Sequence, residues 1–214
     1  MLFKQEIATL GMIGGQMRAV ETLKQHFEPG MTYRRADVAR WSNAVDRHLK
    51  MLMADGTLTK LAGGLYYRPK PTSFGAAPAR DEDLVASFLK DRRFLLTSPN
   101  SYNSLGLGST QLYNETVVYN HKRHGRFKLG KRTFDFRVKP HFPDKLTPAF
   151  LLVDVVNNHT RLAEDSEMLL ANVKRRAQMM DREELAEAVR SYGGLRAKKF
   201  FQPVLGEDTL TYAR

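Results

Sequence analysis

The fold of this chain is decided by residues 43–68, which read NAVDRHLKMLMADGTLTKLAGGLYYR. The first part has a helical period, because its apolar residues form one continuous stripe made of Val45, Leu49, Leu52 and Met53. The second part changes to short apolar runs on either side of Gly63 and Gly64, a pair that supplies the positive backbone angles of a hairpin turn. The stretch therefore predicts a helix over residues 43–54 followed by a β-hairpin.

Two further helical segments precede this stretch. Residues 12–27 place Val20, Leu23 and Phe27 on one face of a helix, which ends at Glu28-Pro29-Gly30. Thr32 is predicted to cap a short second helix over residues 33–40. The order of helix, short helix, longer helix and glycine hairpin is that of a winged helix-turn-helix, in which the third helix enters the major groove of DNA.

The outward side of the third helix supplies the first candidates for DNA contact. With the apolar stripe facing inward, the outward residues are Asn43, Asp46, Arg47 and Lys50. Asn and Arg carry forked groups that match the edges of adenine and guanine. Ser42 is expected to cap this helix and to bond phosphate. Further contacts to the DNA backbone are predicted at the start of the second helix and on the hairpin, from Thr32, Tyr33, Arg34, Arg35, Lys60 and Arg68.

The charge of the chain also favours a polyanionic partner. The formal net charge is +11, and residues 121–145 hold nine Lys/Arg against two acids. Such a cluster raises the local potential and attracts nucleic acid. The residues of this cluster that are predicted to contact DNA are Lys122, Arg123, Arg126, Lys128, Lys131 and Arg132. A basic surface that only keeps the protein in solution is the alternative interpretation.

The rest of the chain predicts a mixed C-terminal domain. Residues 72–80 are rich in Pro, Gly, Ala and Ser, so we expect a winged helix over residues 1–70, a linker over residues 71–80 and a second domain over residues 81–214. Strands are predicted at residues 115–120, 125–129 and 133–138, and helices at residues 81–89, 101–107, 163–180 and 182–192. Residues 150–156 fit a buried strand or a short core helix. The predicted fold class is α+β.

Several short motifs resemble a known family. They are residues 45–56, Leu58, Leu61, residues 64–69, Thr97-Ser98-Pro99, residues 105–111, the basic strands around residues 126–137 and Tyr192-Gly193-Gly194. These motifs are similar to those of the AbiEi-like antitoxins, transcriptional regulators of abortive-infection, type IV toxin–antitoxin systems. Between Gln111 and Arg126 the chain is richer in Asn and His than the family pattern, which leaves the C-terminal contact residues open.

The resemblance implies a partner as well as a fold. Such proteins bind inverted repeats in the promoter of their own operon, through the winged helix and a basic face of the C-terminal domain, with two copies on one operator. They also neutralise a toxin that resembles a nucleotidyltransferase, without the need for a stable complex. We therefore expect a DNA-binding repressor and antitoxin, with no catalytic activity, cofactor or metal of its own.

Three alternatives remain from the residues themselves. The winged helix could serve protein contact, and the C-terminal domain could bind the toxin directly. The chain could instead be a nucleotidyltransferase, with Asp135 and Asp154 as magnesium ligands and Gly106-Leu107-Gly108-Ser109 holding a phosphate, although such enzymes need two carboxylates one residue apart on one strand. His121 and His124 have a ligand spacing, but the cations between them oppose a metal ion.

The composition excludes some classes of protein. The chain has no cysteine, which excludes disulfides, thiolate nucleophiles and cysteine-ligated metals. No stretch approaches eighteen consecutive apolar residues, so a membrane-spanning helix is excluded. The first residues, MLFKQE, do not resemble a signal peptide, and we expect a cytoplasmic protein.

Overall fold

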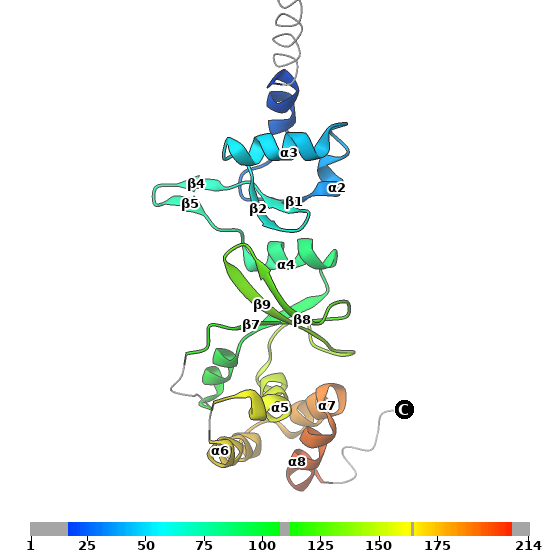
Figure 1. The fold of residues 1–214 in the computed structure, drawn as a ribbon. Coiled ribbons are helices and arrows are strands. Elements are labelled where there is room, and N and C mark those ends of the chain that lie inside the picture. Colours follow the sequence, from blue (N-terminus) through cyan, green and yellow to red (C-terminus); the bar gives the residue numbers. More distant parts are fainter. Residues whose placement is uncertain (1–16, 108–111, 164, 207–214) are drawn as a thin grey trace, which may run out of the picture. The chain divides into compact units, whose positions relative to one another are not determined.

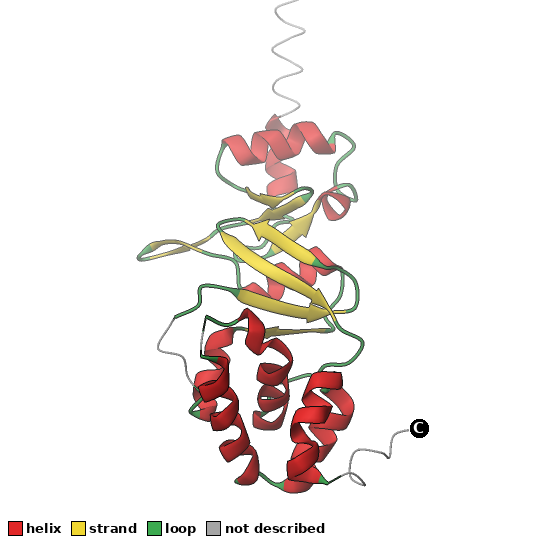
Figure 2. Cartoon of the chain, turned by 60° about the horizontal axis from the view of Figure 1, so that its bottom comes forward, coloured by secondary structure: helices red, strands yellow, loops and turns green. Residues whose placement is uncertain are grey.

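The computed structural model describes residues 17–107, 112–163 and 165–206, which form two compact units (Figure 1). The first unit runs up to Arg92 and includes Lys128–Arg132. The second unit contains Arg93–Phe127 and the chain from Thr133 onward. Both helices and small sheets are present, and the C-terminal part is helical (Figure 2). The predicted α+β class is confirmed at this level.

The N-terminal part of the first unit combines helices with a three-stranded antiparallel sheet. In chain order the elements are a helix over residues 17–24, β1 (Thr32–Arg34), α2 (Arg35–Val38), α3 (Val45–Ala54), β2 (Thr59–Ala62) and β3 (Leu65–Tyr67). β3 is the central strand, and its Tyr66 pairs with Tyr33 on one side and Lys60 on the other. These elements enclose one core, made of Val20, Leu23, Phe27, Val38, Leu49, Leu52, Leu58 and Tyr66.

The predicted third helix and its hairpin are confirmed. α3 buries Leu49 and Leu52, and Val45 and Met53 pack against the same core with part of their surface exposed. The helix begins at Val45, two residues later than predicted, with Ala44 as its N-cap. Gly64 in the turn between β2 and β3 has a φ of +67°, a conformation that residues with a Cβ rarely adopt.

The prediction that Thr32 caps a helix is wrong. Thr32, Tyr33 and Arg34 form β1, which pairs with β3, and α2 begins only at Arg35. A three-residue strand has too few residues to show an alternating pattern, and its pairing depends on a partner that is distant in the sequence. The helix predicted over residues 33–40 is therefore limited to Arg35–Val38.

The segment predicted to be a linker contains a second hairpin. β4 (Lys70–Thr72) and β5 (Gly75–Ala77) pair antiparallel and extend away from the rest of the first unit (Figure 1). α4 (Asp81–Leu89) follows in the same unit. Tyr67 Oη donates to the Ala77 carbonyl at 2.7 Å, and Arg34 Nε donates to the Ser87 carbonyl at 2.7 Å. The prediction of a linker over residues 71–80 is wrong, because its glycine and its small residues form a tight turn between paired strands.

The second unit contains a four-stranded sheet. Its strands lie in the order β6 (Phe94–Thr97), β7 (Thr116–Asn120), β9 (Arg132–Val138) and β8 (Gly125–Leu129), with β6 antiparallel and β9 parallel to β7. The turn between β8 and β9 contributes Lys128–Arg132 to the first unit. Phe134 and Phe136 are fully buried and Thr133 is exposed, as expected for a strand with one buried face, but Val138 at the end of β9 is exposed as well. β6 was not predicted.

Helices complete the second unit (Figure 2). They are α5 (Pro148–Asn158), α6 (Ser166–Gln178), α7 (Arg182–Tyr192) and α8 (Leu195–Leu205), with the 3-10 helices η1 (Pro99–Leu105) and η2 (His159–Arg161). The apolar run over residues 150–156, for which strand and helix were both open, lies in α5. Thr147 Oγ1 accepts from the Phe150 N–H and Pro148 occupies the first turn, which together start this helix.

α5 is buried on all sides because η1, α6, α7 and α8 contact it. α8 was not predicted, and its Phe201 is fully buried.

None of the helices in the described residues is long and apolar enough to span a membrane.

Candidate nucleic-acid interface

The side of α3 opposite the core is polar and exposed. Asp46, Arg47 and Lys50 are exposed on the helix, and Asn43 is exposed in the turn before it. The prediction that these residues face outward is therefore confirmed. In the part of the chain that the structure describes, neither Arg47 nor Lys50 forms an ion pair, so both charges are available to a ligand.

Arg35 and Asp46 pair with each other at the edge of this face. Arg35 Nε and Nη2 donate to the two carboxylate oxygens of Asp46 at 2.8 and 2.7 Å. These hydrogen bonds lower the pKa of the Asp46 carboxyl and raise the pKa of Arg35. The two charges offset each other, so Arg47 and Lys50 carry the net positive charge of the α3 face.

The entry to α3 is fixed by a hydroxyl and an aromatic cluster. Ser42 Oγ lies 2.8 Å from His48 Nδ1 and accepts from the Ala44 N–H, so Ser42 is not the N-cap that the sequence predicts. His48 is buried, and its ring nitrogen gives the hydroxyl a partner one turn into the helix. Trp41 stacks on His26 with ring centroids 4.9 Å apart. These contacts set the direction in which α3 leaves the preceding turn.

Four residues predicted to contact phosphate have partners inside the first unit instead. Tyr33 Oη accepts from the Glu28 N–H, and its ring packs edge-on against Phe27. Arg68 donates to the carbonyls of Lys24 and Phe27, at the C-terminal end of the first helix. Thr32 and Arg34 bond residues of α4, through Ser87. Tyr33 accepts through its hydroxyl, while Arg34 and Arg68 donate and Thr32 shares a hydrogen bond with Ser87, so these four side chains help to stabilise the first unit.

Lysines of the predicted basic cluster lie beside the β2–β3 hairpin. The Gly130 N–H donates to the Leu61 carbonyl at 2.7 Å, which places the β8–β9 turn next to β2. Lys60 on β2 and Lys128 and Lys131 on that turn are all exposed. Arg132 forms an ion pair with Asp81. The structure thus brings three lysines from distant parts of the sequence onto the first unit.

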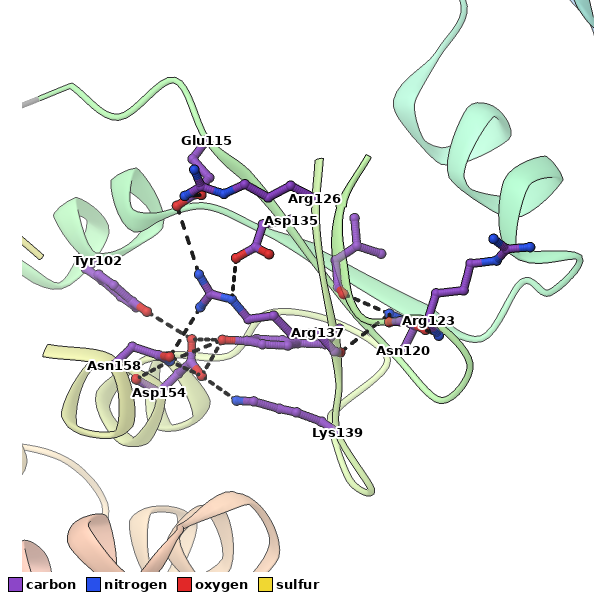
Figure 3. Close-up of polar contacts among 12 residues, drawn as sticks. Tyr102, Glu115, Asn120, Arg123, Arg126, Asp135, Arg137, Lys139, Asp154 and Asn158 are labelled. Atoms are coloured by element: carbon purple, nitrogen blue, oxygen red, sulfur yellow. Dashed lines mark hydrogen bonds and ion pairs between the residues drawn. The ribbon is translucent and has the colours of Figure 1, made fainter. Parts of the chain in front are cut away.

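The other half of the basic cluster belongs to the second unit. The buried Asn120 side chain accepts from the backbone N–H groups of Lys122 and Arg123 at 2.8 and 2.7 Å and donates to the Arg123 carbonyl (Figure 3). This fixes the turn while both basic side chains stay exposed. Arg126 pairs with Glu115 at 2.8 Å, which offsets its charge.

Asp135 and Asp154, considered above as magnesium ligands, are each paired with a cation of the protein. Arg137 donates to Asp135, and Lys139 Nζ donates to Asp154 at 2.7 Å (Figure 3). Asp154 is buried and also accepts from Tyr102, Tyr119 and Asn158.

Burial, with the nearby Asp154 charge, raises the pKa of both tyrosines. Among the residues that the structure describes, no group of three or more His, Asp or Glu side chains is arranged to hold a metal ion. His121 stacks on Phe142, and Gly108-Ser109 lie outside the described residues.

The β4–β5 hairpin is part of the first unit that the sequence analysis missed. It exposes Lys70 and Phe74.

Comparison with known proteins places the chain in a family. No curated protein matches the sequence. The fold is similar to the crystal structure of the RV2827C protein from Mycobacterium tuberculosis, with a TM-score of 0.55 and 15% sequence identity over 91% of this chain and 76% of that one. The match to the DUF6088 family covers residues 23–154, more than half of the chain, and the protein therefore belongs to DUF6088, a family of unknown function.

Proposed function

We propose that the protein binds double-stranded DNA through its first unit, which acts as a winged helix, and that it represses transcription. The observation that carries this proposal is α3, which buries Leu49 and Leu52 on one side and exposes Arg47 and Lys50 on the other. A helix with one side anchored in a core and a basic side free is what groove binding requires.

The dimensions of α3 fit the major groove. An α-helix with its side chains is about 10–12 Å across, and the major groove is about 12 Å wide. Arg47 lies in the first turn of α3, near the N-terminal end, where recognition helices contact bases, and Asn43 lies in the turn just before the helix. Arg47 is suited to a bidentate contact with guanine, and Lys60, Lys128 and Lys131 to phosphates beside the groove.

The biological role rests on the resemblance to AbiEi-like antitoxins. It supports autoregulation at inverted repeats and neutralisation of a nucleotidyltransferase-like toxin. In this proposal Lys122, Arg123 and Arg126 of the second unit form an additional DNA contact. Direct binding of the toxin by the second unit is the competing role.

DNA binding is tested by its dependence on salt. Fluorescence anisotropy with a labelled duplex of mixed sequence should give an affinity that falls steeply as salt rises, with a log–log slope near −5 if about six phosphates are contacted. A slope near zero, or the absence of binding at low salt, would overturn the proposal.

Recognition of specific DNA bases is tested with the Arg47→Ala variant. Arg196→Ala on α8 is the control, because it removes the same charge. On the duplex upstream of the protein's own reading frame, Arg47→Ala should weaken binding by about 10- to 100-fold, because a bidentate Arg–guanine contact contributes roughly 1–3 kcal/mol. On a mixed-sequence duplex the loss should be much smaller. Equal losses on both duplexes would make Arg47 a phosphate contact.

The competing role is tested by reversing two exposed charges of the second unit, Lys122→Glu together with Arg123→Glu. We expect weaker binding to every duplex, because both residues are assigned to the additional DNA contact. If DNA binding is intact and only neutralisation of a co-expressed toxin is lost, direct toxin binding is the better description.

A further inference from the structure

Phe74 lies at the tip of the β4–β5 hairpin and is fully exposed, at 101% of its reference surface. Two hydrogen bonds close the turn that holds it. Thr72 Oγ1 donates to the Gly75 carbonyl at 2.6 Å and accepts from the Phe74 N–H at 3.3 Å. Gly75 has a φ of +104°, which closes the turn. The ring is therefore presented by a defined turn.

Phe74 has the highest exposed fraction of the large hydrophobic side chains in the described residues, above Leu112 at 85% and Leu195 at 82%. Of the phenylalanines in the described residues, Phe74 alone is exposed; the others are buried or partly buried. The strands of the hairpin are themselves largely exposed, so the hairpin does not serve to cover a core. Exposure of a whole aromatic ring to water is unfavourable, and aromatic rings contribute strongly when an interface buries them.

The surroundings of the ring favour a polyanion. Lys60 and Lys70 of the first unit are exposed, whereas Arg68 donates to backbone carbonyls and Arg80 forms ion pairs with Glu82 and Asp83. Lys70 is exposed on β4 of the same hairpin. The ligand should be negatively charged and should offer a surface on which an aromatic ring can stack. Double-stranded DNA has both properties, because its bases stack between two phosphate backbones.

We propose that the β4–β5 hairpin is a second DNA-contacting element, in which Phe74 inserts at a base step and Lys70 binds the adjacent phosphate. This inference rests on the proposed function. Apolar side chains inserted from the minor groove partly unstack a base step and kink the duplex by about 20–90°. Flexible pyrimidine–purine steps such as TA are the easiest to open. The hairpin would thus select deformable DNA and bend it.

The test uses the full chain and a duplex of about 30 base pairs with central TA steps, labelled at its ends for energy transfer, and with 2-aminopurine beside one TA step. Binding of the wild-type protein should shorten the end-to-end distance and raise the 2-aminopurine fluorescence. Phe74→Ala should abolish both signals and weaken binding about five- to tenfold. Phe74→Leu should preserve most of the bend, because a leucine can also act as a wedge. Ser73→Ala is the control in the same turn.

The outcomes separate the two proposals. If the wild-type protein shows no salt-dependent binding to any duplex, the proposed function fails. If it binds with the expected salt dependence but Phe74→Ala bends and binds the duplex like wild type, only the role of Phe74 is overturned. A Phe74→Ala variant that changes the sedimentation of the free protein but not the DNA bend would assign the ring to self-association and would also overturn the inference.

Discussion

Replacement of Asp154 by Asn should strongly destabilise the second unit. The Asp154 carboxylate is fully buried and accepts from Tyr102, Tyr119, Asn158 and Lys139 at 2.7–3.0 Å. An amide has almost the same shape, so no cavity forms. The amide has only one acceptor oxygen, however, and its NH2 group replaces the second carboxylate oxygen. The donors that bonded this second oxygen then face another donor.

The magnitude follows from this geometry. Hydrogen bonds to a charged group contribute about 1.5–3 kcal/mol each, and breaking a buried ion pair costs about 3–5 kcal/mol. The Lys139 side chain is 23% exposed and regains part of its hydration, so the lower end applies. We expect a loss of about 3 kcal/mol in the free energy of unfolding. With a urea dependence of about 2 kcal/mol per molar, the midpoint falls by about 1.5 M.

The two units can be followed by different signals. Far-UV circular dichroism reports mainly on α5–α8, while the single tryptophan, Trp41, reports on the first unit. Asp154→Asn should shift the circular dichroism transition. Asp144→Asn, an exposed acid of the same unit, is the control. A shift no larger than that of Asp144→Asn would refute the reasoning that this carboxylate holds the network together.

Three further predictions follow from the contacts described above. Folding raises the pKa values of Tyr102 and Tyr119, so the unfolded chain loses these protons at a lower pH than the folded chain does. The free energy of unfolding is therefore constant with respect to these groups below pH about 10. Above that pH it falls by about 1.4 kcal/mol per pH unit for each tyrosine. Tyr102→Phe with Tyr119→Phe should flatten this alkaline slope in urea titrations. Asp46→Asn should raise duplex affinity about three- to tenfold and steepen the salt slope by about 1, because Arg35 loses its ion pair and can bind a phosphate. An unchanged slope in anisotropy titrations would mean that Arg35 does not reach the DNA. Arg68→Met should cost about 1.5–3 kcal/mol in the Trp41 unfolding transition, because the Lys24 and Phe27 carbonyls lose their charged donor, whereas the exposed Lys60→Met should cost almost nothing.

The sequence by itself determined the elements whose pattern is local. The stripe of α3 and the Gly63-Gly64 turn are each set by neighbouring residues, and the structure agrees with both. The same periodicity assigned Arg47 and Lys50 to the exposed side of α3, because a helix that buries one stripe must expose the other.

Only the tertiary structure decided which polar side chains are available to a ligand. Arginine is a residue type that commonly binds phosphate, so the sequence predicted this role for Arg34 and Arg68. In the structure each donates a hydrogen bond to a backbone carbonyl of a segment that is distant in the sequence. β1 and the β4–β5 hairpin are too short to show a period, and the apolar run in α5 fits a strand or a helix until its neighbours are in place. These features depend on pairings between residues far apart in the chain, which no local pattern encodes.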